Sequence, residues 1–227
     1  MSFKALLKIG GSLVNDPTSF KNLCNHLEKL YSLHPFIIIP GGGLFADNVR
    51  LIDKEFNLKA EHSHFMAILS MNLIGYLLHT QLTKSLLVSN IEKLNYSKWK
   101  AENDLMIPIF LPFKYLLNND ILPHSWEITS DSIAYFIAQE LKINKIILVK
   151  NVDGLFDKDP NKFSNAKFIS QISADELLKM SGTSCIDKYL PILIKKYKTS
   201  CFLVSGLYPS RITKIIENKK AKFSLIF

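Results

Sequence analysis

The stretch "FKALLKIGGSL" at residues 3–13 joins a short apolar run to a glycine turn. The run ends at Gly10 and Gly11, which predicts a buried β-strand followed by a tight turn. Two glycines allow backbone N–H groups to approach an anion closely, and Ser12 adds a hydroxyl group. Lys8, near the end of the strand, could hold a transferring phosphoryl group. A plain turn with a surface lysine is the alternative interpretation.

A second glycine turn follows the next apolar run. "PFIIIP" at 35–40 has the length of a strand, and Gly41, Gly42 and Gly43 lead from it into a helical pattern. Three consecutive glycines indicate a backbone requirement, and the N–H groups at the start of a helix attract anions. The stretch matches neither GxGxxG nor GxxxxGK[ST], so neither an ordinary dinucleotide-binding fold nor a P-loop is supported.

Two polar stretches in the second half of the chain stand beside predicted elements. "TSDSIA" at 129–134 begins a helical pattern, and Thr129, Ser130 or Asp131 can each serve as the N-cap. "VDGLFDKDP" at 152–160 follows an apolar run. That stretch is either an ordinary surface turn or, beside an anion site, a segment that holds a nucleotide. In open α/β sheets, ligands bind beyond the carboxyl ends of the strands.

Apolar runs and helical patterns alternate along the whole chain. We expect strands at 3–9, 35–40, 85–89, 107–112, 144–150, 200–206 and 221–227. We expect helices at 16–33, 44–56, 61–83, 131–141, 174–181, 188–197 and 209–218. Near-continuous apolar strands separated by helices indicate a mostly parallel sheet that is covered on both faces. We therefore expect an α/β fold in one unit, with any division into lobes near 120–125.

Local signals refine two of these helices. Asp16 stands before Pro17, which predicts an N-cap followed by proline in the first turn. In the helix at 44–56, the spacing of Phe45, Val49 and Ile52 predicts one buried face.

Composition narrows the class of protein. The chain has 227 residues, of which 48% are hydrophobic, so it can bury a substantial core. Its formal net charge of +8 fits an anionic ligand or nucleic acid, but the lysines are dispersed over the sequence, and we expect no nucleic-acid partner. The apolar runs are far shorter than the roughly 20 residues that span a bilayer, and no signal peptide is visible, so we expect no membrane association.

The cysteines and histidines indicate neither a disulfide framework nor a metal site. Cys24, Cys185 and Cys201 are odd in number and form no CxxC pair, which favours buried thiols in a reducing cytoplasm. His62 and His64 are two residues apart, whereas a ligand pair on one helix prefers a spacing of three or four. We expect no metal ligands in the chain.

Together, the four stretches resemble the amino acid kinase family, in the order "KIGGSL", "PGGG", "TSDSIA" and "VDGLFDKDP". The resemblance covers nearly the whole chain. It implies an αβα sandwich with a mostly parallel central sheet, and an ATP-dependent kinase that uses Mg²⁺. Residues 1–122 would bind the phosphoryl acceptor, and residues 123–227 would bind ATP. By the same analogy, we expect a homo-oligomer.

The resemblance also implies roles for individual residues. Lys8 and Lys188 are expected to flank the transferred phosphoryl group, and Asp131 to hold both lysines in position. A small-residue turn at 181–184 precedes the second lysine. The ATP-binding residues implied by the family are Gly10, Gly11, Ser12, Lys150, Asp153, Gly154, Phe156, Lys158 and Pro160.

A narrower resemblance concerns the acceptor. "PGGGLFADNVR", the helix "HFMAILSMNLIGYLL" and "LPHSWEITSDSIA" are similar to a small branch of the family, the kinases of methanofuran biosynthesis. That branch converts an aminomethylfuran-methyl phosphate to its diphosphate. A furan ring would suit Trp126, and a phosphate would suit Arg50. Packing between the two lobes is the alternative role for Trp126. The substrate-binding residues implied are Gly41, Gly42, Gly43, Asp47, Arg50, His64, His124 and Trp126.

Other members of the family fit less well but remain alternatives. Uridylate kinases usually carry basic residues after the first glycine pair, where this chain has "VND" at 14–16. Isopentenyl phosphate kinases carry a His-rich glycine motif, where this chain has "PGGGLFADNVR". A non-catalytic protein that binds a nucleotide or another anion on the same fold is the third alternative, because fold alone does not determine function.

Overall fold

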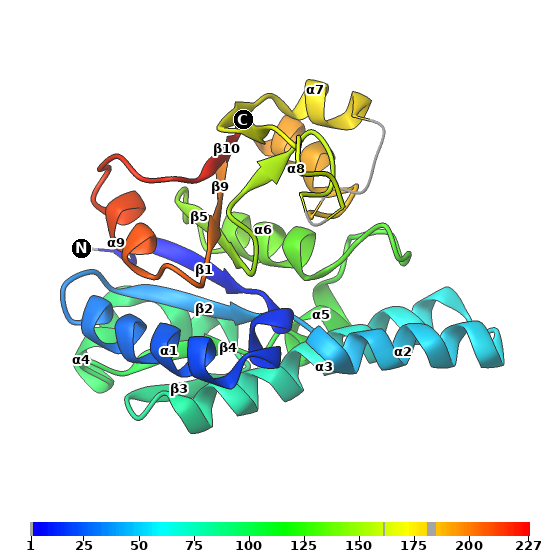
Figure 1. Ribbon diagram of the computed structural model, residues 1–227. Helices are drawn as coiled ribbons and strands as arrows, with labels where there is room; N and C mark the ends of the chain where they lie inside the picture. Colours follow the sequence, from blue (N-terminus) through cyan, green and yellow to red (C-terminus); the bar gives the residue numbers. More distant parts are fainter. Residues whose placement is uncertain (1, 161, 181–184) are drawn as a thin grey trace.

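The computed structural model describes residues 2–160, 162–180 and 185–227, and its centre is an eight-stranded sheet (Figure 1). The strands follow the order β3-β4-β2-β1-β5-β9-β10-β8, and each pair of neighbours is parallel except β9 and β10. The mostly parallel sheet expected from the sequence is confirmed. The strands of the sheet are β1 (Ala5–Ile9), β2 (Phe36–Pro40), β3 (Ser85–Val88), β4 (Ile107–Phe110), β5 (Ile146–Lys150), β8 (Gln171–Ile172), β9 (Cys201–Ser205) and β10 (Ser224–Ile226).

Helices cover both faces of this sheet. One face packs against α1 (Pro17–Tyr31), α9 (Ser210–Ile216) and the second half of α3 (Ala60–Gln81). The other face packs against α4 (Tyr96–Glu102), α5 (Phe113–Asn119), α6 (Ser130–Glu140), α7 (Ala174–Lys179) and α8 (Leu190–Tyr197). Successive strand residues point to opposite faces of the sheet. Leu7 packs against the face that α1 and α9 cover, and Leu6 packs against the face that α6 and α8 cover. None of the helices in the described ranges has the length and apolar character needed to cross a membrane.

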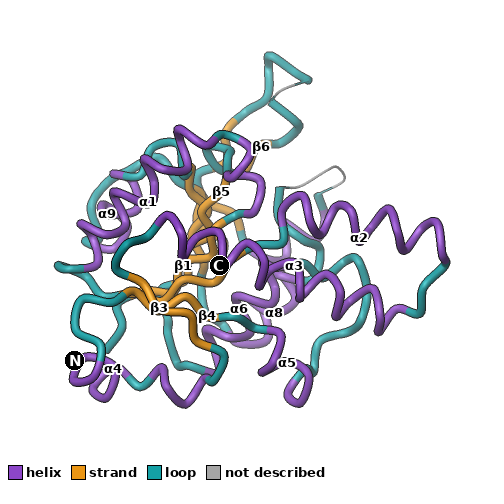
Figure 2. The backbone as a smooth tube through the Cα atoms, turned by 90° about the horizontal axis from the view of Figure 1, so that it is seen from below, coloured by secondary structure: helices purple, strands orange, loops and turns teal. Residues whose placement is uncertain are grey.

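The helices α2 (Gly43–Phe56) and α3 form a hairpin that extends beyond the sheet (Figures 1 and 2). Of the expected apolar face of α2, Val49 is buried and Phe45 is half-buried, but Ile52 is 40% exposed. The prediction of one buried face is therefore wrong for Ile52. The reason is that α2 packs mainly against α3 instead of the sheet, so a narrower stripe is covered.

Local capping follows the sequence closely. The Asp16 carboxylate accepts hydrogen bonds from the backbone N–H groups of Thr18 and Ser19, both at 3.1 Å, and so caps α1. Thr129 caps α6 by accepting a hydrogen bond from the N–H of Asp131.

The sequence did not predict α4, α5, the antiparallel pair β6 (Leu155–Phe156) and β7 (Phe168–Ile169), or the short 3-10 helices Gly11–Asn15 and Ile91–Leu94.

Strand order locates a crevice at the carboxyl ends of β1 and β5. From β1 the chain continues through α1 to β2 on one side, and from β5 it continues to β9 on the other side. Ligands bind at such a point of divergence in open α/β sheets, because the connecting segments leave the edge uncovered.

Candidate active site

Two lysines at this crevice converge on one carboxylate. Lys8 on β1 lies opposite Leu148 on β5, so Lys150, two residues further along, is on the same face of the sheet. That face is covered by α6, whose first turn carries Asp131. The Lys8 Nζ is 2.8 Å from Asp131 Oδ1, and the Lys150 Nζ is 2.5 Å from Asp131 Oδ2. The strand register and the start of one helix thus assemble a buried cluster of three charges.

Burial and charge together determine the protonation of this cluster. The Asp131 side chain is 1% exposed. Burial alone would raise its pKa, but the positive charges of Lys150 and Lys8 outweigh burial and hold that pKa at about 2. The pKa of Lys8 is lowered because burial outweighs the attraction of Asp131. Burial also disfavours the charged form of Lys150, but the negative charge of Asp131 and its hydrogen bond outweigh burial, so the pKa of Lys150 is raised. With both lysines protonated, the cluster carries one net positive charge and favours an anion.

The two lysine contacts differ in kind. Lys150 donates a hydrogen bond to Asp131 and another to the backbone carbonyl of Cys185. Lys8 pairs with Asp131 Oδ1 at 2.8 Å, and within the described residues its ammonium has no second partner of the kind that Lys150 has. The Lys8 ammonium therefore keeps donors for a ligand, whereas Lys150 is held in place by the protein.

A second buried carboxylate, Asp187, fixes the backbone around Asp131. It accepts hydrogen bonds from the N–H and hydroxyl groups of Thr129, from both groups of Ser132, and from the N–H of Leu190, at 2.6–3.0 Å. Burial, together with the negative charge of Asp131, raises its pKa. Asp187 thus joins the start of α6 to the start of α8. Asp187 was not predicted from the sequence, although an aspartate three positions before an apolar helix is a possible N-terminal cap.

The two glycine turns touch each other through their backbones. A Cβ atom on Gly11 would lie 2.1 Å from the nitrogen of Gly43, and a Cβ atom on Gly41 would lie 2.8 Å from the nitrogen of Gly11. Gly43 also has a φ of +52°, in the left-handed region. This close approach explains the glycines, and it brings the two turns together beside Lys8.

A cavity of about 250 Å³ opens at this junction. One end is lined by Lys8, Lys150 and the two glycine turns, and the wall includes the apolar side chains of Ile68 and Met71. The predicted site residues that line it are Lys8, Gly10, Gly11, Ser12, Gly42, Gly43, Asp47, Arg50, His64, Trp126 and Lys150. Four residues assigned from the sequence to ATP, namely Gly10, Gly11, Ser12 and Lys150, therefore share one cavity with residues assigned to the acceptor.

A larger cavity of about 770 Å³ adjoins the first. Trp126, Thr129 and Lys150 line both cavities, while Asp131 and Lys188 line the larger one. The charged cluster therefore lies where the two cavities meet, so a group in one can reach a group in the other past Lys150.

Trp126 forms part of the wall between the cavities. Its indole Nε1 donates a hydrogen bond of 2.5 Å to Asp53, and the guanidinium of Arg50 lies 4.5 Å above its ring. Both partners belong to α2, so these contacts connect the loop before α6 to the α2–α3 hairpin. Asp53 was not predicted from the sequence as a partner of Trp126.

Comparison with known proteins matches this arrangement to one family. Residues 4–205 match the model of the Amino acid kinase family. The chain belongs to the amino acid kinase family. It is 36% identical, over 94% of its length and 93% of the relative, to the 5-(aminomethyl)furan-3-yl-methyl phosphate kinase of Methanocaldococcus jannaschii. The protein is accordingly an ATP-dependent kinase.

More distant relatives share the same fold. The chain is 25% identical to the uridylate kinase of Sulfurisphaera tokodaii, over 94% of this chain and 93% of that protein. The solved structure of uridylate kinase from Archaeoglobus fulgidus superposes with a TM-score of 0.72 at 18% identity, covering 98% of this chain and 99% of that one. The αβα amino acid kinase fold expected from the sequence is confirmed.

Lys188 does not occupy the position that its family role implied. Its side chain is 80% exposed and pairs with Glu127 at 3.1 Å, and the second lysine beside Asp131 is Lys150. The prediction that Asp131 holds Lys188 is therefore wrong in this structure. Lys188 precedes α8, on the rim of the larger cavity, whereas Lys150 is fixed by the register of β5. The small-residue turn predicted at 181–184 lies outside the described residues.

The segment expected to hold ATP turns away from both cavities. Asp153 pairs with Arg211 and Lys222, each at 2.6 Å, and thereby ties the turn after β5 to α9 and to the chain before β10. Gly154, with a φ of +150°, packs closely against Phe168. Phe156, Lys158 and Pro160 line neither cavity: Phe156 packs edge-on against Phe168, and the Lys158 ammonium is 5.5 Å from the ring of Phe163.

Two acceptor residues lie just outside the smaller cavity. Gly41 supports the contact between the glycine turns. His124 does not line the cavity but stacks on His64, which does, and both rings face Asp120.

Proposed function

We propose that the protein transfers the γ-phosphoryl group of ATP to a small acceptor that already carries a phosphate, specifically an aminomethylfuran-methyl phosphate, and so forms its diphosphate. The observation that carries this proposal is the charged cluster of Lys8, Lys150 and Asp131 at the end of a small cavity. The 36% identical relative named for this acceptor supports the choice.

The lining of the smaller cavity suits each part of that acceptor. Lys8, Lys150 and the backbone N–H groups of the glycine turns would bind the phosphate. The apolar wall and Trp126 would cover the furan ring. Asp47 is the one carboxylate among the described residues that line this cavity, and it would attract the protonated amine.

The chemistry follows from the protonation states. An oxygen of the acceptor phosphate attacks the γ-phosphorus of ATP, the bond from that phosphorus to the β–γ bridging oxygen breaks, and ADP leaves. Lys8 and Lys150 stabilise the negative charge that spreads over the γ-phosphoryl oxygens. Asp131, with a pKa of about 2, stays ionised and positions both lysines without accepting a proton. A general base is unnecessary because the acceptor oxygen is already ionised near neutral pH.

We assign the larger cavity to ATP and the smaller one to the acceptor. The smaller cavity is lined by both the expected acceptor-binding part at 1–122 and the expected ATP-binding part at 123–227, so the acceptor would lie between the two. Lys188, on the rim of the larger cavity, would contact the nucleotide. The carboxylates at the junction do not suit Mg²⁺, because Asp131 is paired with two lysines and Asp187 accepts five hydrogen bonds. Mg²⁺ would therefore arrive on the phosphates of ATP.

Two further features of the proposal concern assembly and compartment. The α2–α3 hairpin exposes large apolar side chains, among them Phe56 at 71% and Leu51 at 65%, which supports a homo-oligomer formed through this hairpin. Three free cysteines support a reducing cytoplasm as the compartment.

A uridylate kinase is the second candidate, and the 25% identical relatives favour it. UMP is considerably larger than aminomethylfuran-methyl phosphate, and a cavity of about 250 Å³ is at the small end of ligand sites. The smaller acceptor therefore fits better.

The proposal is tested by steady-state kinetics with ATP, Mg²⁺ and three acceptors: aminomethylfuran-methyl phosphate, UMP and isopentenyl phosphate. The diphosphate product is identified by mass spectrometry. We expect the highest kcat/KM with the furan. A higher kcat/KM with UMP would establish the second candidate, and ATP binding without transfer to any of the three would point to a non-catalytic role.

A further inference from the structure

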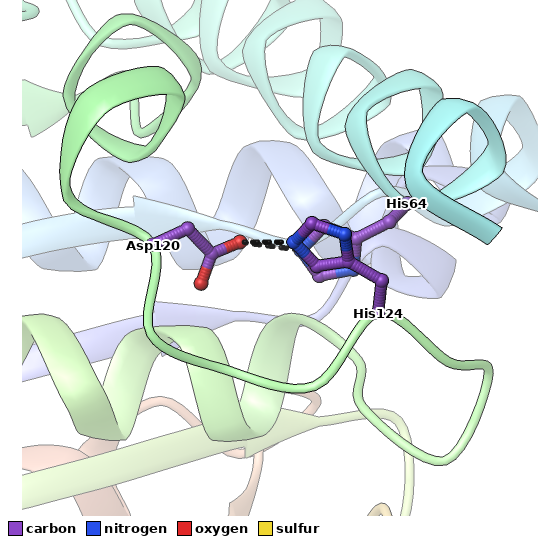
Figure 3. A group of neighbouring side chains, drawn as sticks. All are labelled: His64, Asp120 and His124. Atoms are coloured by element: carbon purple, nitrogen blue, oxygen red, sulfur yellow. Dashed lines mark hydrogen bonds and ion pairs between the residues drawn. The ribbon is translucent and has the colours of Figure 1, made fainter.

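Three side chains outside the phosphoryl-transfer cluster converge on one point beside the smaller cavity (Figure 3). His64 comes from the first turns of α3, Asp120 follows the last residue of α5, and His124 lies in the loop that leads to α6. The His64 Nε2 is 2.7 Å from Asp120 Oδ2, and the His124 Nε2 is 3.6 Å from the same oxygen. The two imidazole rings are stacked, with centroids 4.5 Å apart and planes inclined by 19°.

Hydrogen bonding explains only part of this arrangement. His64 and Asp120 are close enough for a hydrogen bond, and both side chains are 4% exposed. At 3.6 Å, His124 is too distant for one, yet its Nε2 faces the same carboxylate oxygen. The other oxygen of Asp120 accepts the backbone N–H of Leu122 at 2.9 Å, which fixes the direction of the carboxylate. One oriented carboxylate oxygen therefore lies opposite two ring nitrogens.

The distances suit a metal ion after a small adjustment. Zinc binds histidine nitrogen and carboxylate oxygen at about 2.0–2.2 Å, so two such ligands in a tetrahedral site are about 3.3 Å apart. The two nitrogen-to-oxygen distances here, 2.7 and 3.6 Å, lie on either side of that value. All three ligand atoms are within 4.8 Å of one another. Because the two rings are stacked almost parallel, one imidazole would have to turn for both Nε2 lone pairs to reach a single ion. The Leu122 hydrogen bond supplies the kind of supporting contact that orients metal ligands.

We propose that His64, Asp120 and His124 bind one divalent transition-metal ion of the Zn²⁺ class. Two imidazoles and one carboxylate favour such an ion over Mg²⁺, which prefers oxygen ligands and water. The site is separate from the Mg²⁺ that accompanies ATP. Spacing along one helix could not reveal it, because the two histidines are 60 residues apart and the usual pattern of ligands within one helix is absent.

The ion has a structural consequence for the acceptor cavity. His64 lines that cavity, while Asp120 and His124 belong to the segment that leads to Trp126 and Thr129. A bound ion would fasten this segment to α3 and place a positive charge beside the acceptor cavity, which His64 lines. It would use three protein ligands and leave further coordination positions for water or for an oxygen of the acceptor.

The test is metal binding by the tag-free, full-length protein after treatment with a chelator, without ATP or acceptor. Cobalt(II) is titrated by visible absorption, and Zn²⁺ by competition with a chromophoric chelator. We expect one equivalent to bind, and Zn²⁺ to raise the Tm, since binding to the folded state stabilises it. In His124→Ala and Asp120→Asn, the affinity should fall by at least about 100-fold. His62→Ala is the matched control, because His62 is exposed on the same helix, and it should bind as the wild type does.

Three outcomes would overturn the proposal: no cobalt spectrum, a Zn²⁺ Kd weaker than about 1 mM, or unchanged affinity in His124→Ala. The cluster would then be only a hydrogen-bonded connection between α3 and the loop. Circular dichroism of each variant establishes that it is folded, and the half-exposed His124 is the substitution least able to disturb the core. Because neither substrate is present, failure of this test leaves the proposed kinase reaction unaffected, and the reverse is also true.

Discussion

Two carboxylates in this protein each lie between two cations, but they belong to different regions. Asp131 is 1% exposed, and its two lysines stand where two cavities meet. Asp153 is 28% exposed, and Arg211 and Lys222 bind it on the outside of the sheet, away from both cavities. The pKa of each carboxyl group is lowered by its cations. Ion pairing alone therefore does not distinguish the two carboxylates, whereas their position relative to the cavities does.

The largest difference between the two regions should come from their lysines. We expect Lys8→Ala to lower kcat/KM about 1000-fold, because it removes a charge that stabilises the transferring phosphoryl group. Lys222→Ala, which removes a cation from Asp153, should change kcat/KM less than about threefold. Steady-state assays of both variants measure the contrast. A similar loss in both would mean that the lysines act through overall stability.

The next comparison separates the two candidates for the second catalytic lysine. Lys150→Ala should lower kcat roughly 100-fold, since Lys150 contacts Asp131. Lys188→Ala should raise the KM for ATP about tenfold and change kcat little, because its side chain is 80% exposed at the rim of the larger cavity. If Lys188→Ala lowers kcat more than Lys150→Ala, the original family-based assignment is right and Lys188 must move during catalysis.

Lowering the pH should reduce the stabilising contribution of Asp131 more than that of Asp153. The pKa of Asp131 is about 2 in the folded protein and near 3.9 in an unfolded chain. Its ionised form therefore stabilises the folded state above about pH 4, by roughly 2–3 kcal/mol, and this contribution is lost as the pH falls toward 2. The free energy of unfolding, measured with urea between pH 5 and pH 2, should fall more steeply for the wild type than for Asp131→Asn. The more exposed Asp153, tested as Asp153→Asn, should alter that slope less, and identical slopes in all three proteins would contradict the pairing.

The smallest effect concerns the wall between the cavities. Trp126→Phe keeps an aromatic ring but removes the N–H group that binds Asp53. We expect the KM for the acceptor to rise about threefold to tenfold, with the KM for ATP unchanged, because one interfacial hydrogen bond contributes about 1 kcal/mol. An equal rise for both substrates would show that Trp126 supports the two cavities alike.

Much of the fold could be predicted because its signals are local. Continuous apolar runs such as residues 36–40 and 146–149 became central strands, and Asp16 capped the helix that it precedes. The two-residue strands β6 and β7 were missed because so short a pattern has no measurable period. The buried face of α2 was misjudged at Ile52, since the periodicity of a helix does not reveal whether a sheet or another helix covers it.

The site was predicted where chemistry coincides with a turn, and missed where it depends on tertiary neighbours. Gly11 and Gly43 are recognisable because runs of glycine follow predicted strands, and the structure shows that a side chain there would collide with the opposite turn. The pairing of Lys150 with Asp131 requires the knowledge that β5 lies beside β1, which no local pattern contains. Asp120 stands in a polar stretch, "NND", and only the fold brings it to the histidines.

The proposal that Asp131 positions Lys8 and Lys150 for phosphoryl transfer is tested most directly by comparing Asp131→Asn with Asp153→Asn in the same kinase assay. The first variant leaves Lys8 and Lys150 close together without their carboxylate, and we predict a loss of roughly 100-fold in kcat. The second removes an equally paired carboxylate away from the cavities, and its kcat should stay within about threefold of the wild type. Full activity in Asp131→Asn, or an equal loss in both variants, would contradict this role of Asp131.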